Sequence, residues 1–106
     1  MLEDKQLKLV NDLLNYELDY EHYELRDQYN SESEAFDYIL ETIQTEKGIN
    51  IVSNYLRDDV ENFRFLYNEN PEDERNKEMY ERSLKLFKEV INYKRDFKKM
   101  EIGRVI

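Results

Sequence analysis

Apolar residues recur along this chain at spacings of three and four, the spacing that places side chains on one side of an α-helix. The clearest stripe lies in the middle of the chain and consists of Val52, Tyr55, Leu56, Val60, Phe63, Leu66 and Tyr67. Strict alternation of apolar and polar residues, which would indicate a strand, is confined to the short stretch 49–52. The pattern therefore predicts an all-α protein.

Residues that favour helix ends divide the pattern into four segments. We expect helices over residues 2–28, 32–47, 51–69 and 71–100, followed by a short C-terminal tail, 101–106. Ser31 and Glu34 have capping-box spacing, Gly48 suits a helix C-cap, and Asn70 precedes the one proline as a helix N-cap would. Because the joints are short, neighbouring helices should be antiparallel, as a single domain that is either a four-helix bundle or a pair of long helical hairpins.

The first predicted helix differs from the others because it carries two apolar stripes. One consists of Leu7, Val10, Leu14, Leu18 and Leu25, and the other, roughly 150° away, of Leu9, Leu13, Tyr16, Tyr20 and Tyr23. Two interpretations are open. Either this helix contacts other helices on both sides, or its tyrosines and neighbouring acids form an exposed surface for a partner. The candidate partner-binding residues in the second case are Tyr16, Asp19, Tyr20, Tyr23, Glu24 and Asp27.

Charge is distributed unevenly along the chain. Residues 1–46 hold 13 Asp and Glu against 3 Lys and Arg, whereas residues 82–104 hold 8 Lys and Arg against 3 Asp and Glu. The simplest use of this asymmetry is internal, with the acidic first helix attracting the basic last one. The net charge of −9 opposes general binding to nucleic acid and favours basic protein partners.

A basic ridge on the last predicted helix is the one feature that could contact phosphates. Helical spacing aligns its members on one side of that helix: Lys88, Arg95 and Lys99. We interpret this ridge mainly as a solvated face, part of which offsets the acidic first helix.

Two acidic residues fall close to apolar stripes. Asp59 lies in the middle of the third helix's apolar face, and Glu21 lies near the leucine stripe of the first helix. A carboxylate in such a place needs a partner, for which Lys94, Lys98 or a tyrosine hydroxyl are the candidates. The alternative is that two carboxylates in a low-dielectric site serve as general acid and base.

Other catalytic and metal-binding sets are incomplete. His22 follows Asp19 by three residues, but a di-iron bundle site needs two such motifs and two further glutamates, and the chain has one His. It has no Cys and no glycine-rich phosphate loop. We therefore expect no enzyme, no cofactor and no metal. The absence of Cys and of an apolar stretch of about 20 residues indicates a cytoplasmic protein without a membrane span.

These observations favour a small non-enzymatic protein-binding module, an inhibitor or adaptor that presents the acidic, tyrosine-rich face of its first two helices to a basic partner. Immunity proteins, antitoxins and phage-encoded inhibitors share this size and acidity, an analogy at the level of shape alone. The alternative is a self-associating structural protein in which the tyrosine stripe closes a homodimer. Nucleic-acid binding through the last helix ranks third.

Overall fold

The computed structural model describes the backbone of residues 2–20 and 32–105 and the side chains of residues 3–16 and 34–99. The described backbone forms four helices and no strand: α1 (Leu2–Tyr20), α3 (Glu32–Thr42), α4 (Glu46–Glu69) and α5 (Glu74–Val105). The all-α prediction is confirmed. None of these helices is both long enough and apolar enough to cross a membrane.

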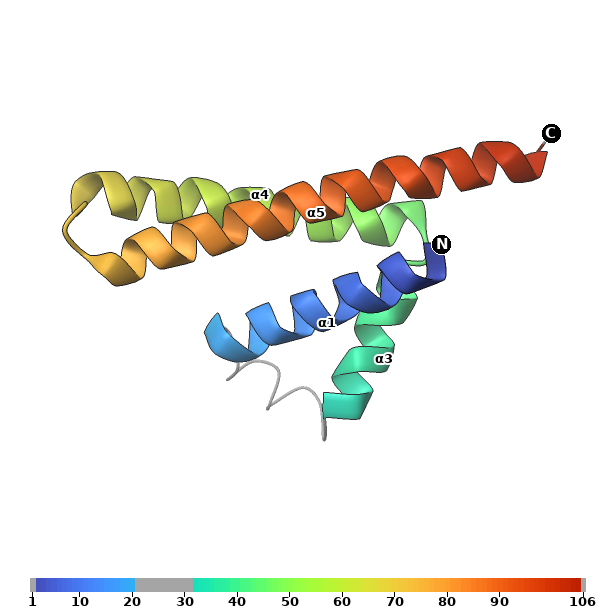
Figure 1. Ribbon diagram of the computed structural model, residues 1–106, viewed down its shortest axis with the longest axis horizontal. Helices are drawn as coiled ribbons and strands as arrows, with labels where there is room; N and C mark the ends of the chain where they lie inside the picture. Colours follow the sequence, from blue (N-terminus) through green and yellow to red (C-terminus); the bar gives the residue numbers. More distant parts are fainter. Residues whose placement is uncertain (1, 21–31, 106) are drawn as a thin grey trace.

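A long antiparallel hairpin of α4 and α5 is the main feature of the arrangement (Figure 1). Helix α1 packs along α5, and α3 packs against α1 and runs steeply across the direction of the hairpin. The fold therefore combines one hairpin with two further helices on one side of it. The end of the hairpin where α4 and α5 join extends beyond α1 and α3 (Figure 1).

The hydrophobic core lies where α1 meets the hairpin. Its buried members come from α1, the turn after α3, α4 and α5: Leu9, Val10, Leu13, Tyr16, Ile43, Ile49, Leu56, Leu86, Val90, Tyr93 and Phe97. Both stripes of α1 contribute, because α1 has α3 on one side and α5 on another. Tyr16 is only 1 % exposed. Its assignment to a partner-binding surface was wrong, and its ring belongs to the core.

The joint between α3 and α4 corrects the predicted helix ends. Helix α4 begins at Glu46 rather than at residue 51, because Thr45 caps it: the Thr45 Oγ1 accepts a hydrogen bond of 3.1 Å from the Gly48 N–H. Gly48 thus lies in the first turn of α4 and does not end the preceding helix. A Cβ at Gly48 would lie 1.8 Å from the Thr42 carbonyl oxygen, so close packing against that carbonyl requires glycine here.

The joint between α4 and α5 uses a different cap from the predicted one. The backbone N–H of Asn70 donates to the Leu66 carbonyl, so Asn70 ends α4. The Asp73 Oδ1 accepts a hydrogen bond of 2.9 Å from the Arg75 N–H, and α5 begins at Glu74 rather than at residue 71.

At its other end, α5 continues through Gly103 to Val105, so residues 101–105 are not a separate tail. One glycine inside a helix costs only about 1 kcal/mol, which does not by itself stop a helix. The predicted continuation of the first helix to residue 28 and the Ser31 cap lie outside the described residues.

Candidate functional site

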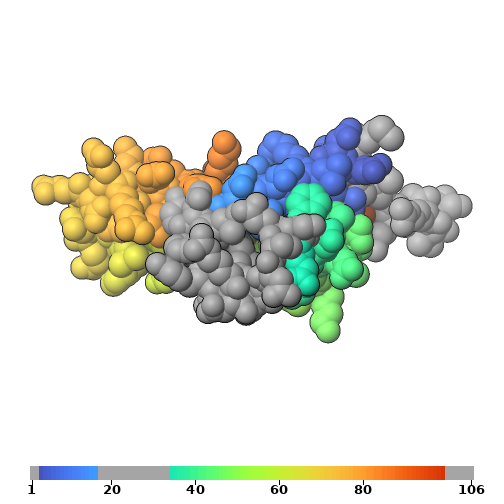
Figure 2. All heavy atoms as spheres, turned by 90° about the horizontal axis from the view of Figure 1, so that it is seen from below, coloured from blue at the N-terminus to red at the C-terminus, as the bar shows by residue number. Residues whose placement is uncertain are grey.

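Helix α3 presents an exposed acidic face. Four residues at helical spacing form it, and we call them the α3 acidic face: Glu34, Asp37, Tyr38 and Glu41. Tyr38 is 55 % exposed, and α3 contains no Lys or Arg. The opposite side of the helix is apolar and packs toward α1 and the core. Figure 2 shows α3, in turquoise and green, at the surface beside the blue α1.

This surface lies on one of the two helices that were predicted to carry a binding face, and the binding itself stays a prediction. The second predicted helix was expected to contribute acidic positions, and α3 does so. The first helix was expected to contribute the tyrosines, but Tyr16 is buried. The side chains of Asp19, Tyr20, Tyr23, Glu24 and Asp27 lie outside the described residues, so the exposed tyrosine of the described surface is Tyr38.

Asp59, on the apolar face of α4, has a hydrogen-bond partner of a predicted kind. The Tyr16 hydroxyl donates a hydrogen bond of 2.6 Å to the Asp59 Oδ2, which joins α1 to α4 across the core. A tyrosine hydroxyl was among the three predicted partners, and Lys98 instead lies 3.7 Å from Glu46. Glu21 lies outside the described residues. The Tyr16–Asp59 contact joins two helices, and the alternative of a catalytic carboxylate pair with Glu21 falls outside the described residues.

A carboxylate pair that the sequence did not reveal bridges α1 and α5. The Lys8 Nζ lies 2.8 Å from the Asp12 Oδ2 and 3.0 Å from the Glu89 Oε1. Lys8 and Asp12 have the spacing of a helical ion pair, a signal that was visible in the sequence. The third member was not visible, because the rotation of α5 about its axis decides whether Glu89 faces α1.

The protonation of this cluster follows from its burial and hydrogen bonds. Burial, and then the hydrogen bond with Asp12, raise the pKa of the Glu89 carboxyl. Burial also acts to raise the pKa of Asp12, but hydrogen bonds with Lys8 and Glu89 outweigh it and lower that pKa. Hydrogen bonds to Asp12 and Glu89 raise the pKa of Lys8. Lys8 therefore stays charged between the two carboxyl groups, of which Glu89 is the one that holds a proton more readily.

Among the residues whose side chains are described, the ion pairs between α1 and α5 join lysines of α1 to acids of α5, which is the reverse of the predicted pairing. Lys5 lies 2.6 Å from Asp96, and Lys8 lies 3.0 Å from Glu89. The Lys5 hydrogen bond lowers the pKa of Asp96. The predicted basic ridge does not take part in these pairs. Its three members are exposed on α5: Lys88, Arg95 and Lys99.

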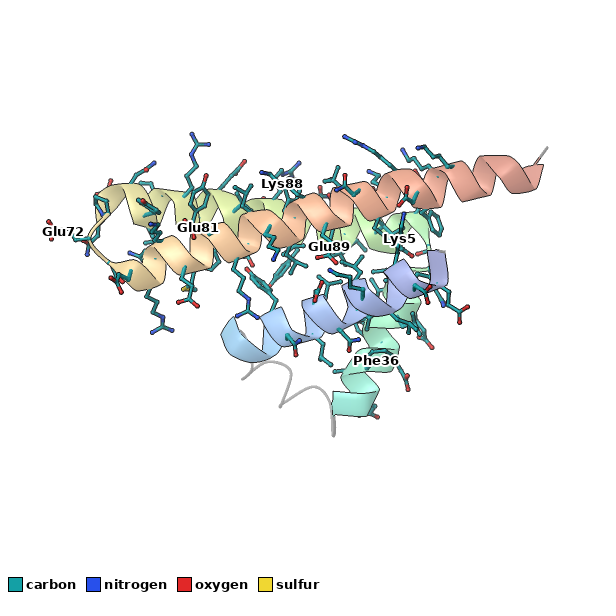
Figure 3. All side chains as sticks on the ribbon, in the orientation of Figure 1. Lys5, Phe36, Glu72, Glu81, Lys88 and Glu89 are labelled. Carbon is teal, nitrogen blue, oxygen red and sulfur yellow. The ribbon has the colours of Figure 1, made fainter. Side chains whose placement is uncertain are left out.

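An open groove of about 480 Å³ runs along the seam between α1 and α5. Its lining is Lys5, Lys8, Leu9, Lys85, Lys88, Glu89, Asn92, Tyr93 and Asp96. Figure 3 shows Lys5 and Glu89 near the seam and Lys88 further round α5. A smaller hollow of about 210 Å³ shares Lys8, Lys85 and Glu89 with this groove.

Tyr93 fixes the inner wall of the groove. Its hydroxyl donates a hydrogen bond of 2.9 Å to the Ile43 carbonyl oxygen and accepts one of 3.0 Å from the Gln6 Nε2. Burial raises the pKa of this phenol. The groove wall is therefore tied both to α1 and to the turn that follows α3.

The fold and these surfaces define a small all-α protein with an acidic helix face and a lysine-lined groove. Among the described residues, no group of three or more His, Cys, Asp and Glu side chains is placed to hold a metal ion, and His22 lies outside them. Comparison with protein families, with curated proteins and with solved structures found no match. Function is therefore inferred from the residues and their geometry.

Proposed function

We propose that this protein is a non-enzymatic binding module, of the inhibitor or adaptor type, that presents the α3 acidic face to a basic surface on a partner protein. The observation that carries the proposal is the composition of that face. Three carboxylates surround one exposed tyrosine, and the helix that bears them has no basic residue.

The chemistry of this face suits protein recognition. Tyrosine provides a large, fairly rigid contact area together with a hydroxyl that tolerates water, and it is enriched at interfaces. Carboxylates around it attract a basic surface over a distance, raise the association rate and exclude acidic partners. A net charge of −9 reinforces that attraction.

The packing of α3 against the core supports its use as a preformed surface. Ala35 is buried, while Phe36, Ile39 and Leu40 are partly buried against the core. The Thr42 hydroxyl donates to the Tyr38 carbonyl oxygen at 2.8 Å within the last turn of the helix. A partner would therefore meet an ordered helix and would not have to order it, which reduces the entropic cost of binding.

Site-specific cross-linking can identify the partner. A photoreactive amino acid would replace Tyr38, and a control protein would carry it in place of Glu78, an exposed residue of α5. We expect a basic protein to be cross-linked from position 38 and not from position 78. Equal labelling from both positions, or labelling of acidic proteins alone, would contradict the proposal.

Affinity for the purified partner then tests the face itself. Asp37→Lys with Glu41→Lys reverses its charge, and Glu78→Lys with Glu81→Lys makes the same change in net charge on α5. We expect the α3 variant to weaken binding by about 100-fold, since close interfacial charge pairs couple by about 1.5 kcal/mol or more each. The α5 variant should have a much smaller effect. Equal losses would mean that total charge, and not this face, governs binding.

A further inference from the structure

We propose that the groove between α1 and α5 binds a small organic anion with an apolar body, such as an aromatic or acyl carboxylate or sulfonate. Lys85 and Lys88 would hold the charged group, and the apolar body would lie along the seam. This site is on a different surface from the α3 acidic face, and its existence does not depend on the proposed function.

Local charge is the first argument. The groove is lined by four lysines and two carboxylates, although the whole chain has a net charge of −9. Both carboxylates already face a lysine from α1, at 2.6 Å for Asp96 and 3.0 Å for Glu89. In contrast, no ion pair joins Lys85 or Lys88 to another described residue, although the charge of Lys85 acts on Asp12, which lines the adjoining hollow and is paired with Lys8. The groove therefore has positive charge that its own carboxylates do not neutralise.

Shape and polarity are the second argument. The volume of about 480 Å³ falls in the range that small-molecule sites occupy. The inner wall is formed by Leu9 and Tyr93, which are 1 % and 3 % exposed, and the methylene stems of the lysines extend along the sides. Since the Tyr93 hydroxyl is already hydrogen-bonded to Ile43 and Gln6, Tyr93 contributes its aromatic ring rather than an unpaired polar group to the wall.

The size of the ligand follows from the contrast between local and total charge. A long polyanion such as nucleic acid would experience the net charge of −9 over its whole length and would be repelled. A small anion experiences mainly the field inside the groove, because salt screens charges further than about 8 Å away at physiological ionic strength. An apolar body adds burial along the seam that inorganic anions cannot gain.

Fluorescence titration with 1-anilinonaphthalene-8-sulfonate is the test, with the full chain at neutral pH. Two comparison probes separate the contributions: N-phenyl-1-naphthylamine, which has a similar apolar body without the sulfonate, and inorganic sulfate as a competitor. We expect the sulfonate dye to bind about tenfold or more tightly than the neutral one, and sulfate to compete only weakly. Equal binding of both dyes, or full competition by sulfate at low concentration, would overturn the proposal.

Variants locate the site. Lys85→Glu with Lys88→Glu should weaken dye binding about tenfold or more, whereas Lys47→Glu with Lys77→Glu makes the same change in net charge on exposed lysines outside the groove. Equal weakening by the two variants would overturn the proposal. If the groove variant does not fold, as judged by its circular dichroism, Lys85→Gln with Lys88→Gln provides the milder substitution and the same comparison.

Amide chemical shifts measured during the titration provide a second readout. We expect the largest changes at Leu9, Asn92 and Tyr93, which line the groove. Changes centred on Phe65 and Leu66, which are exposed at the other end of α4, would place the dye on a different apolar surface and overturn the assignment.

Discussion

Replacing Tyr16 with phenylalanine tests whether α1 is a core helix. The substitution keeps the ring, which is 1 % exposed, and removes only the hydroxyl that donates to the Asp59 Oδ2. No cavity forms, because the change deletes a single atom. The free energy of unfolding should therefore report the loss of the interactions that this hydroxyl makes.

The expected loss can be worked out from this geometry. A hydrogen bond to a charged group contributes about 1.5–3 kcal/mol, and the distance of 2.6 Å is within the range expected for a charge-assisted bond. Asp59 is only partly buried, so water can replace part of what the hydroxyl supplied. We therefore expect Tyr16→Phe to lower the free energy of unfolding by about 1.5–2 kcal/mol. Tyr16→Ala, which also opens a cavity, should cost about 3–5 kcal/mol.

Urea unfolding followed by circular dichroism measures both variants, and a double-mutant cycle isolates the pair. Asp59→Asn removes the charge of the acceptor, and we expect its cost and that of Tyr16→Phe to be non-additive by about 1 kcal/mol. If Tyr16→Phe changes the free energy of unfolding by less than about 0.5 kcal/mol, as surface substitutions do, the hydrogen bond does not stabilise the fold. A similarly small effect of Tyr16→Ala would mean that Tyr16 lies at the surface and not in the core.

Three further substitutions test the joints and the α1–α5 seam. Gly48→Ala should destabilise the fold by about 1–3 kcal/mol in thermal or urea unfolding, because its Cβ would collide with the Thr42 carbonyl oxygen; a variant as stable as the wild type would show that the turn can shift. Tyr93→Phe leaves the Ile43 carbonyl without its donor and should lower the free energy of unfolding by about 1–3 kcal/mol in the same assay. An unchanged free energy of unfolding would mean that water replaces the hydroxyl. Glu89 has a raised pKa in the folded state, so its contribution to stability is fully present below its ordinary pKa of 4.5 and is lost as the pH rises through the folded value. Glu89→Gln should therefore gain stability relative to the wild type as the pH rises above 4.5, and a difference that does not vary with pH would refute this assignment.

The existence and type of the helices could be predicted because apolar spacing is a property of each segment by itself. The ends of the helices were harder to predict, because each joint contains two residues that could cap a helix. Gly48 and Thr45 both suit a helix end, and only packing of the Gly48 backbone against the Thr42 carbonyl favours the use of Thr45 as the cap. Asn70 and Asp73 are equally good N-caps by type, and the backbone hydrogen bond that ends α4 assigns Asn70 to the earlier helix.

The candidate sites could likewise be predicted only where they lie within one helix. The spacing of Glu34, Asp37 and Glu41 was readable in the sequence as one helix face, and so was the need of Asp59 for a partner. The groove and the Glu89 contact depend on how α1 and α5 are rotated about their axes. Periodicity within one helix does not contain that information, since it comes from packing between helices.

The reversed polarity of the α1–α5 seam explains how an acidic chain obtains two surfaces of opposite charge. Helix α1 contains two lysines, and both face α5; residues 82–99 contain two acids, and both face α1. The minority charges of α1 and of residues 82–99 are thus neutralised at the seam, while Lys85, Lys88, Arg95 and Lys99 stay exposed on α5. Pairing of the majority charges would have removed the positive lining of the groove. Surface ion pairs contribute little stability, about 0–1 kcal/mol each, so the main consequence of this seam is which charges remain available to a ligand or partner.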